Sequence, residues 1–161
     1  MRILFVALAV SAAACSRVPP LASTHDSASS LASAVLGAVE RRDRAALEVL
    51  AVSEWEFRDH VWPQLPAARP ERNLPFSYVW LDLKQKSATS LNRTLATHGG
   101  RRYTLVDVTF SGQTDYADYR VHREAVFVVR DATGAQMSLR VCGSMLEKDG
   151  GWKVFSYVVD E

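Results

Sequence analysis

The sequence is poor in the side-chain groupings on which many enzymes and metal proteins depend. It contains two cysteines but no CxxC pair, and it has no glycine-rich phosphate loop and no Ser-His-Asp elbow. Its histidines lack HExxH spacing and a cysteine partner, which argues against a zinc site. These histidines are His25, His60, His98 and His122. We therefore expect no metal and no cofactor.

The sequence also lacks a large excess of positive or negative charge. Lysine and arginine total 19, and aspartate and glutamate total 18. Nucleic-acid binding needs a concentrated basic surface, so we expect no nucleic-acid partner. The 161 residues, 48% hydrophobic and 23% charged, are ordinary for one globular domain.

No apolar run is long enough to span a membrane as a helix, which takes about 20 residues. The apolar stretch 3–10 follows the basic start Met1-Arg2 and precedes the small residues 11–14, as in a signal peptide. With the next residue, Cys15, this stretch resembles a bacterial lipoprotein signal, in which residues 1–14 are removed and the cysteine is lipidated. Ordinary secretory cleavage near Ala14 is the alternative, because the residue at position 12 is not the usual leucine.

The lipoprotein resemblance implies that Cys15 carries several acyl chains, palmitate among them, which together anchor a protein stably in a membrane. It implies a place in the bacterial cell envelope. Because Ser16 is not the aspartate of an inner-membrane retention signal, we expect the outer membrane, facing the periplasm. Residues 15–29 are rich in Ser, Pro and Ala and predict a flexible tether, and residues 30–161 predict a single domain.

Helical patterns begin this domain. Apolar residues recur at helical spacing over 31–39, and Asp43 suits the N-cap of a second helix. Ser53 and Glu56 have the spacing of a capping box, which begins a third helix that ends at Pro63. Four prolines between 63 and 75 predict an extended, hydrogen-bond-poor connection of lid-like length.

One long helix follows. Asn73 is its predicted cap, Pro75 lies in its first turn, and Gly99-Gly100 ends it. Residues 78–84 alone also fit an alternating strand, but the helical period continues far beyond them. The apolar stripe of the helix comprises Phe76, Val79, Trp80, Leu83, Ser87, Leu91, Thr94 and His98.

Strand patterns fill the last third of the chain. They cover residues 103–110, 119–130, 136–145 and 152–159, with tight turns at 131–134 and 149–151. In the first strand, Val106, Val108 and Phe110 are predicted to share one face. The fold class is therefore α+β, with N-terminal helices and one long helix packed on a curved antiparallel four-stranded meander. Cys142 lies inside a strand, where a small buried hydrophobe is expected rather than a nucleophile.

The final hairpin, Asp149-Gly150-Gly151-Trp152-Lys153-Val154, and the strand region 119–148 are similar to the nuclear transport factor two-like superfamily. The resemblance implies a cone-like, cystatin-like α+β fold with a pocket at its open end. Some branches of that superfamily use the pocket as enzymes and others as binding modules. The chain departs from the pattern before the long helix, where the proline-rich connection replaces the usual strand pair.

Arg123 is the first candidate for ligand binding. It occupies the apolar face of its strand, where a guanidinium needs a counter-charge, so it could anchor a carboxylate or phosphate at the pocket mouth. An internal salt bridge is the alternative. Tyr119, Trp62 and Trp80, with His122, are the other candidates for lining a ligand cavity, although aromatic side chains also fill cores.

His60 and His122 are the candidates for catalysis. Neighbouring helical residues point about 100° apart, so His60 cannot pair with the adjacent Asp59 and would need another acid. Asp115, Asp118 and Glu124 are the available partners.

Three classes of function remain. The leading one is a lipid-anchored, non-enzymatic envelope protein that binds a small apolar-anionic ligand or a protein segment in its cone. The second is a small-molecule lyase, isomerase or hydratase with a histidine base and Arg123 as anion anchor. The third is a structural or assembly role through an exposed sheet face, with a homodimer as its expected form.

Overall fold

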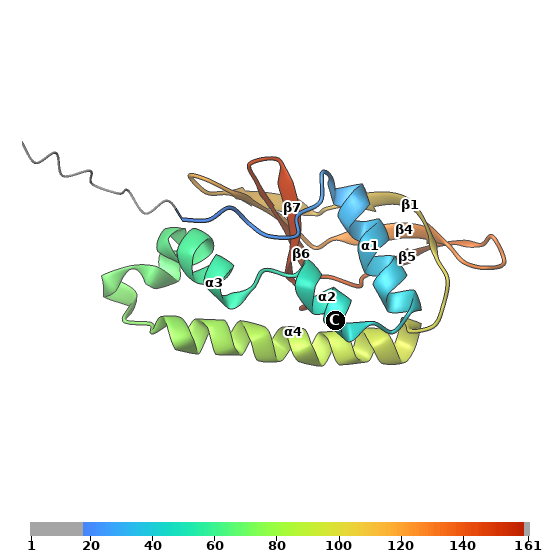
Figure 1. The fold of residues 1–161 in the computed structure, drawn as a ribbon, viewed down its shortest axis with the longest axis horizontal. Helices are drawn as coiled ribbons and strands as arrows, with labels where there is room; N and C mark the ends of the chain where they lie inside the picture. The colour runs from blue at the N-terminus through green and yellow to red at the C-terminus, as the bar shows by residue number, and fades with distance from the viewer. Residues whose placement is uncertain (1–17, 160–161) are drawn as a thin grey trace, which may run out of the picture.

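The computed structural model describes residues 18–159 (Figure 1). The predicted signal peptide and Cys15 lie outside the described residues. The helices are α1 (Ala28–Glu40), α2 (Arg44–Leu50), α3 (Glu54–Glu56) and α4 (Phe76–His98). Within residues 18–159, no helix is both long and apolar enough to cross a membrane.

The strands form two antiparallel sheets. A three-stranded sheet has the order β1-β4-β5, and a four-stranded sheet has the order β2-β3-β6-β7. The α+β class and the two predicted hairpin turns are confirmed, but the prediction of one four-stranded meander is wrong. The strands are β1 (Thr104–Thr109), β2 (Gly112–Asp115), β3 (Arg120–Arg123), β4 (Val126–Arg130), β5 (Gln136–Leu139), β6 (Ser144–Lys148) and β7 (Gly151–Ser156).

Two sheets arise because two of the predicted strands bend. The strand predicted over 119–130 divides into β3 and β4 at Glu124, whose φ of 52° lies in the left-handed region. The next predicted strand divides between β5 and β6, where a Cβ at Gly143 would overlap the carbonyl oxygen of Val158. The amide of Ala125 donates to the carbonyl of Gly143 at 3.1 Å, so the two bends are hydrogen-bonded to each other.

A β-bulge also changes which side chains of β1 lie on the same face. The pairing of β1 with β4 shifts register between Leu105 and Asp107. Val106 is therefore 46% exposed, and the prediction that it shares the inner face with Val108 is wrong.

The predicted helix starts are confirmed where local caps define them. A carboxylate oxygen of Asp43 accepts from the amide of Ala46 at 3.0 Å, and Ser53 and Glu56 make both hydrogen bonds of the capping box. The long helix is confirmed as α4, followed by Gly99. Asn73, however, has a φ of 46° and ends the preceding helical turn, so the N-cap of α4 is Pro75.

The connection from α3 to α4 is not extended as predicted. The helix of α3 continues as one wide turn, η1 (Phe57–Val61), and three short helical turns follow. These turns are η2 (Trp62–Gln64), η3 (Pro66–Ala68) and η4 (Pro70–Arg72), each with a proline in its first two positions. Proline suits these positions because no N–H is needed there and its φ is already helical.

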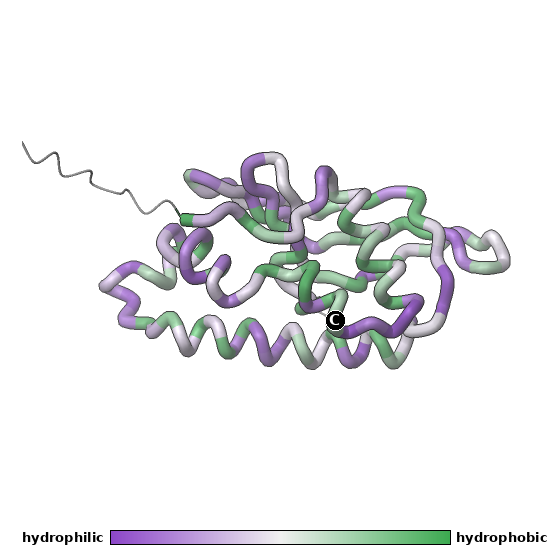
Figure 2. The backbone as a smooth tube through the Cα atoms, in the orientation of Figure 1, coloured by the Kyte–Doolittle hydropathy of each residue, from purple (hydrophilic) through white to green (hydrophobic). Residues whose placement is uncertain are grey.

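The largest core cluster lies between α1, α2 and both sheets. α1 contributes six fully or nearly buried residues, and Phe127 and Val129 of β4 belong to the same cluster. In Figure 2 the hydrophobic colour gathers between α1 and the strands, whereas polar segments recur along α4. A second cluster, around Phe57, Tyr119, Val121 and Leu146, fills the space between η1 and the four-stranded sheet.

The segment before α1 is bound to the domain. His25 and Trp152 exchange backbone hydrogen bonds of 3.0 and 2.8 Å, so this segment pairs with the start of β7. The carbonyl of Pro19 lies 2.8 Å from Nε2 of His60. These residues were assigned to the tether, but from Pro19 onward the chain is held on the domain, and the domain extends to the N-terminal side of residue 30.

Candidate functional site

A cleft lies between α4 and the four-stranded sheet. α4 runs along this side of the molecule (Figure 1), and Leu83, Phe155 and Ser156 separate the space beneath it into two hollows. The hydroxyl groups of Ser87 and Ser156 are 3.4 Å apart, which links α4 to β7 at this division. We call the two hollows together the α4 cleft.

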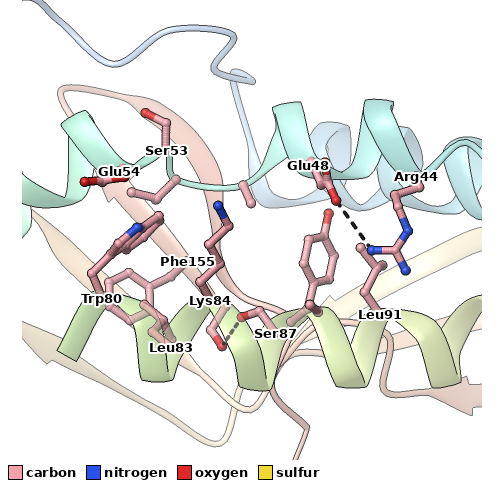
Figure 3. Close-up of a pocket in the computed structure, with 15 residues that line it drawn as sticks. Arg44, Glu48, Ser53, Glu54, Trp80, Leu83, Lys84, Ser87, Leu91 and Phe155 are labelled. Carbon is pink, nitrogen blue, oxygen red and sulfur yellow. Dashed lines mark hydrogen bonds and ion pairs between the residues drawn. The ribbon is translucent and has the colours of Figure 1, made fainter. Parts of the chain in front are cut away.

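The smaller hollow, of about 310 Å³, opens between α4 and the segment from α2 to α3 (Figure 3). Its apolar lining includes Trp80, Leu83, Leu91 and Phe155. Charged side chains of both signs border it, and one pair of them, Arg44 and Glu48, is joined at 3.4 Å. Its mixed rim favours no particular ligand charge.

The larger hollow, of about 550 Å³, opens on the β2 side of α4. Its apolar lining includes Val79 and Leu83 of α4, Val121 of β3 and Phe155 of β7. Its charged lining residues are Asp82, Lys86, Arg123, Glu124 and Arg140. The apolar floor and charged border match the general build of a small-ligand site.

Arg123 lies at the end of β3, on the wall of the larger hollow. Its guanidinium covers the backbone of Gly112 on β2, where an added Cβ would lie 2.9 Å from Nη2. Within residues 18–159, no carboxylate bonds to this guanidinium, and the residue is exposed to solvent. The internal salt bridge considered from the sequence is therefore not formed with any described residue.

The three aromatic residues predicted to line a ligand cavity lie in different parts of the structure. Trp80 lines the smaller hollow and lies 5.4 Å from the ring of Phe57. Tyr119 belongs to the second core cluster, where its hydroxyl donates to the carbonyl of Val61 at 3.2 Å and burial raises its pKa. Trp62 packs edge-on against Phe76, outside both hollows. Of these three residues, Trp80 alone lines the α4 cleft.

His122 lies on the opposite face of the four-stranded sheet from Arg123. Its ring stacks on Trp152 and contacts Phe110 at a tilt, with centroid distances of 4.6 and 4.9 Å, and these two rings also contact each other. Its Nε2 is 2.9 Å from a carboxylate oxygen of Glu147. This is the imidazole–carboxylate contact that a histidine base needs, but it borders neither hollow of the α4 cleft.

His60 is also remote from Arg123. It lines a separate shallow hollow with Asp59 and Asp118, where it contacts the carbonyl of Pro19. The structure thus does not bring a predicted catalytic histidine beside the predicted anion anchor. Within the described residues, no group of three acidic, histidine or cysteine side chains could hold a metal ion.

A buried ion pair was missed by the sequence analysis. Nζ of Lys153 lies 2.9 Å from Glu56 Oε2, and the two side chains are 3% and 0% exposed. Glu56 also accepts from the amide of Ala22 at 2.8 Å, and Lys153 donates to the carbonyl of Ala22 at 2.9 Å. The available signal was a lysine between Trp152 and Val154 in a predicted strand.

Hydrogen bonding controls the charge of Glu56. Burial alone would raise the pKa of its carboxyl group. Hydrogen bonds from the Ser53 amide, the Lys153 ammonium and the Ala22 amide outweigh burial and leave the pKa below its ordinary value. Cys142 behaves in the opposite way, because complete burial raises its pKa to about 12 and no bond offsets it. A thiol in this state is a poor nucleophile, as expected.

Comparison with known proteins adds no further assignment, because the chain matches no protein family, no curated protein and no solved structure.

Proposed function

We propose that this chain is a lipid-anchored envelope protein whose domain binds a small amphipathic anion, such as a fatty carboxylate, in the α4 cleft. One observation carries the proposal: Arg123 has no carboxylate partner among the described residues, on the wall of a hollow with an apolar floor. An exposed cation beside apolar surface fits a ligand with an anionic head and an apolar tail.

The lining charges favour Arg123 as the site of the anionic group. Of the other charged residues there, Lys86 is already bonded to Asp82 at 2.7 Å. The apolar tail would lie against Leu83 and Phe155, which line the larger hollow and also border the smaller one. Burial of such a tail contributes about 0.8 kcal/mol for each CH₂ group removed from water.

The cone-like description of the fold and the place of the protein belong to the same proposal. The α+β class, with a long helix crossing an antiparallel sheet, is compatible with the nuclear transport factor two-like resemblance. The signal-like sequence before Cys15 supports lipidation at that cysteine and residence at the outer membrane, facing the periplasm. Its mass after solvent extraction from membranes would report the acyl chains directly.

A calorimetric titration tests the ligand assignment. Dodecanoate and dodecanol share an apolar tail and differ in the charge of the head group. We expect the wild-type domain to bind dodecanoate more tightly than dodecanol. Arg123→Gln should weaken dodecanoate binding by about tenfold to a hundredfold, because a hydrogen bond to a charged group contributes roughly 1.5–3 kcal/mol. Dodecanol binding should not change.

Arg130→Gln is the matched control, because Arg130 is an exposed arginine at the end of β4 in the other sheet. Equal binding of dodecanoate and dodecanol to the wild-type domain would contradict the proposal, as would equal effects of the two arginine variants.

A further inference from the structure

The first described residues are fixed on the domain. Ala22 is bonded through both its amide and its carbonyl to the buried Glu56–Lys153 pair, and Pro19 contacts His60. Because these contacts bind the segment on both sides of Leu21, the position of Pro19 on the domain surface is defined. Pro19 is four positions from Cys15, with three residues between them.

Those four steps along the chain limit how far Cys15 can lie from the domain. A fully extended chain covers about 3.3–3.6 Å per residue, so Cys15 can lie no more than about 14 Å from Pro19. α4, with 23 residues, is about 35 Å long. Acyl chains on Cys15 would therefore hold one end of the domain against the bilayer and keep the other end away from it.

Figure 1 shows which end this is. The first described residues, the η1–η4 connection and the N-terminal end of α4 lie together at one end, and the β4–β5 hairpin lies at the other. Exposed apolar side chains gather at the first end. Leu74, Tyr78 and Leu81 are 41%, 65% and 61% exposed and follow one face of α4 and the residues before it. Val18 is 49% exposed.

We call Val18, Leu74, Tyr78 and Leu81 the apolar end. They are four of the seven exposed large hydrophobic side chains in residues 18–159. We infer that the apolar end rests on the lipid bilayer, with Tyr78 at the level of the head groups. Tyrosine suits that level because its ring is apolar and its hydroxyl stays hydrated. This inference depends on the proposed lipid anchor at Cys15.

The bilayer contact would orient the α4 cleft. The cleft extends along α4 away from the apolar end, because its lining residues run from Val79 to Leu91. A fatty anion leaving the membrane would meet the cleft within a few turns of helix. The two proposals remain separate, because the first concerns Arg123 and the second concerns Tyr78 and Leu81.

Site-specific fluorescence tests the bilayer contact. In the lipidated full-length protein, Cys15 is acylated and Cys142 is completely buried, so a single added cysteine can be labelled with an environment-sensitive dye. We would label Tyr78→Cys, Leu81→Cys and, as matched control, Met137→Cys, which is 42% exposed on β5 at the far end. Each protein would be reconstituted in phospholipid vesicles with and without brominated acyl chains.

We expect brominated lipid to remove more than half of the emission at Tyr78→Cys and Leu81→Cys and to leave Met137→Cys unchanged. Equal quenching at the two ends, or none at either, would overturn the bilayer contact. The intact mass of each protein is measured first. A mass without acyl chains would show that the proposed anchor has failed, which is distinct from an anchored protein whose apolar end remains in water.

Discussion

The two helices that cover the sheets do so in different ways. Six of the 13 residues of α1 are buried, whereas only Leu91 and Thr94 of the 23 in α4 are. α1 presents Leu31, Val35 and Val39 to the core, and all three are fully buried. α4 presents a stripe that contains Ser87 and Thr94 and remains partly exposed.

This difference indicates that stability and accessible surface come from different sides of the domain. A helix with a wide apolar face seals the sheet beneath it, and a helix with a narrow, interrupted face leaves space. We infer that the α1 side supplies most of the stability and the α4 side supplies the accessible surface. The following variants test that division, from the largest expected effect to the smallest.

Phe127→Ala should cost about 3–5 kcal/mol of unfolding free energy, because it removes a large ring from a fully buried site. Leu83→Ala, in the lining of the α4 cleft, should cost about 1 kcal/mol, because the side chain is already partly hydrated. Urea unfolding followed by circular dichroism measures both. Equal costs would show that the α4 side is packed as tightly as the α1 side.

Lys153→Met should cost about 3–5 kcal/mol, because it leaves the Glu56 carboxylate buried without its counter-charge. Lys84→Met is the control at an exposed position on the rim of the cleft and should change stability by less than about 0.5 kcal/mol. The same unfolding experiment applies. A small loss for Lys153→Met would mean that water reaches Glu56.

Added volume should also distinguish the two helices. Ala32→Leu places extra methyl groups in the sealed core beneath α1 and should cost about 1–3 kcal/mol. Ala88→Leu places them in the smaller hollow and should change stability by about 0.5 kcal/mol or less. Thermal unfolding is sufficient for this comparison, and a large loss for Ala88→Leu would contradict an open hollow.

The pH dependence of the unfolding free energy should reveal the contribution of the Glu56 carboxylate. Its pKa in the folded domain is below the ordinary 4.5, so its contribution is complete above that pH and is lost as the pH falls through the folded pKa. The double variant Glu56→Gln/Lys153→Met should therefore show a shallower loss of stability below pH 4.5. Urea midpoints across the acidic range give the slopes, and identical slopes would exclude Glu56 as a contributor.

Local signals explain what the sequence predicted well. The Asp43 cap, the Ser53–Glu56 capping box and the length of α4 all depend on residues within a few positions of one another. The division into two sheets does not. It depends on Glu124 adopting a left-handed conformation and on Gly143 approaching the distant Val158, contacts that period-two alternation does not contain.

The candidate site shows the same limit. Alternation placed Arg123 on the apolar face of its strand, and this residue borders the α4 cleft. His122 was a candidate for the same cavity, but neighbouring residues of a strand point to opposite faces, and it lies outside both hollows. The binding of the segment before α1 was not predicted, because it requires Glu56 and Lys153 to meet across 97 positions. The position of Ala22, and with it the proposed orientation toward a membrane, depends on that pair.

The most direct test of the open α4 cleft is the reactivity of a thiol placed at Leu83, which borders both hollows. In a Cys15→Ala background, Leu83→Cys would be treated with a small thiol reagent, and buried Cys142 provides an internal unreactive reference. We expect rapid modification at position 83 and strong protection by dodecanoate. A thiol there as unreactive as Cys142 would contradict an open cleft, and rapid modification without protection would contradict the proposed ligand.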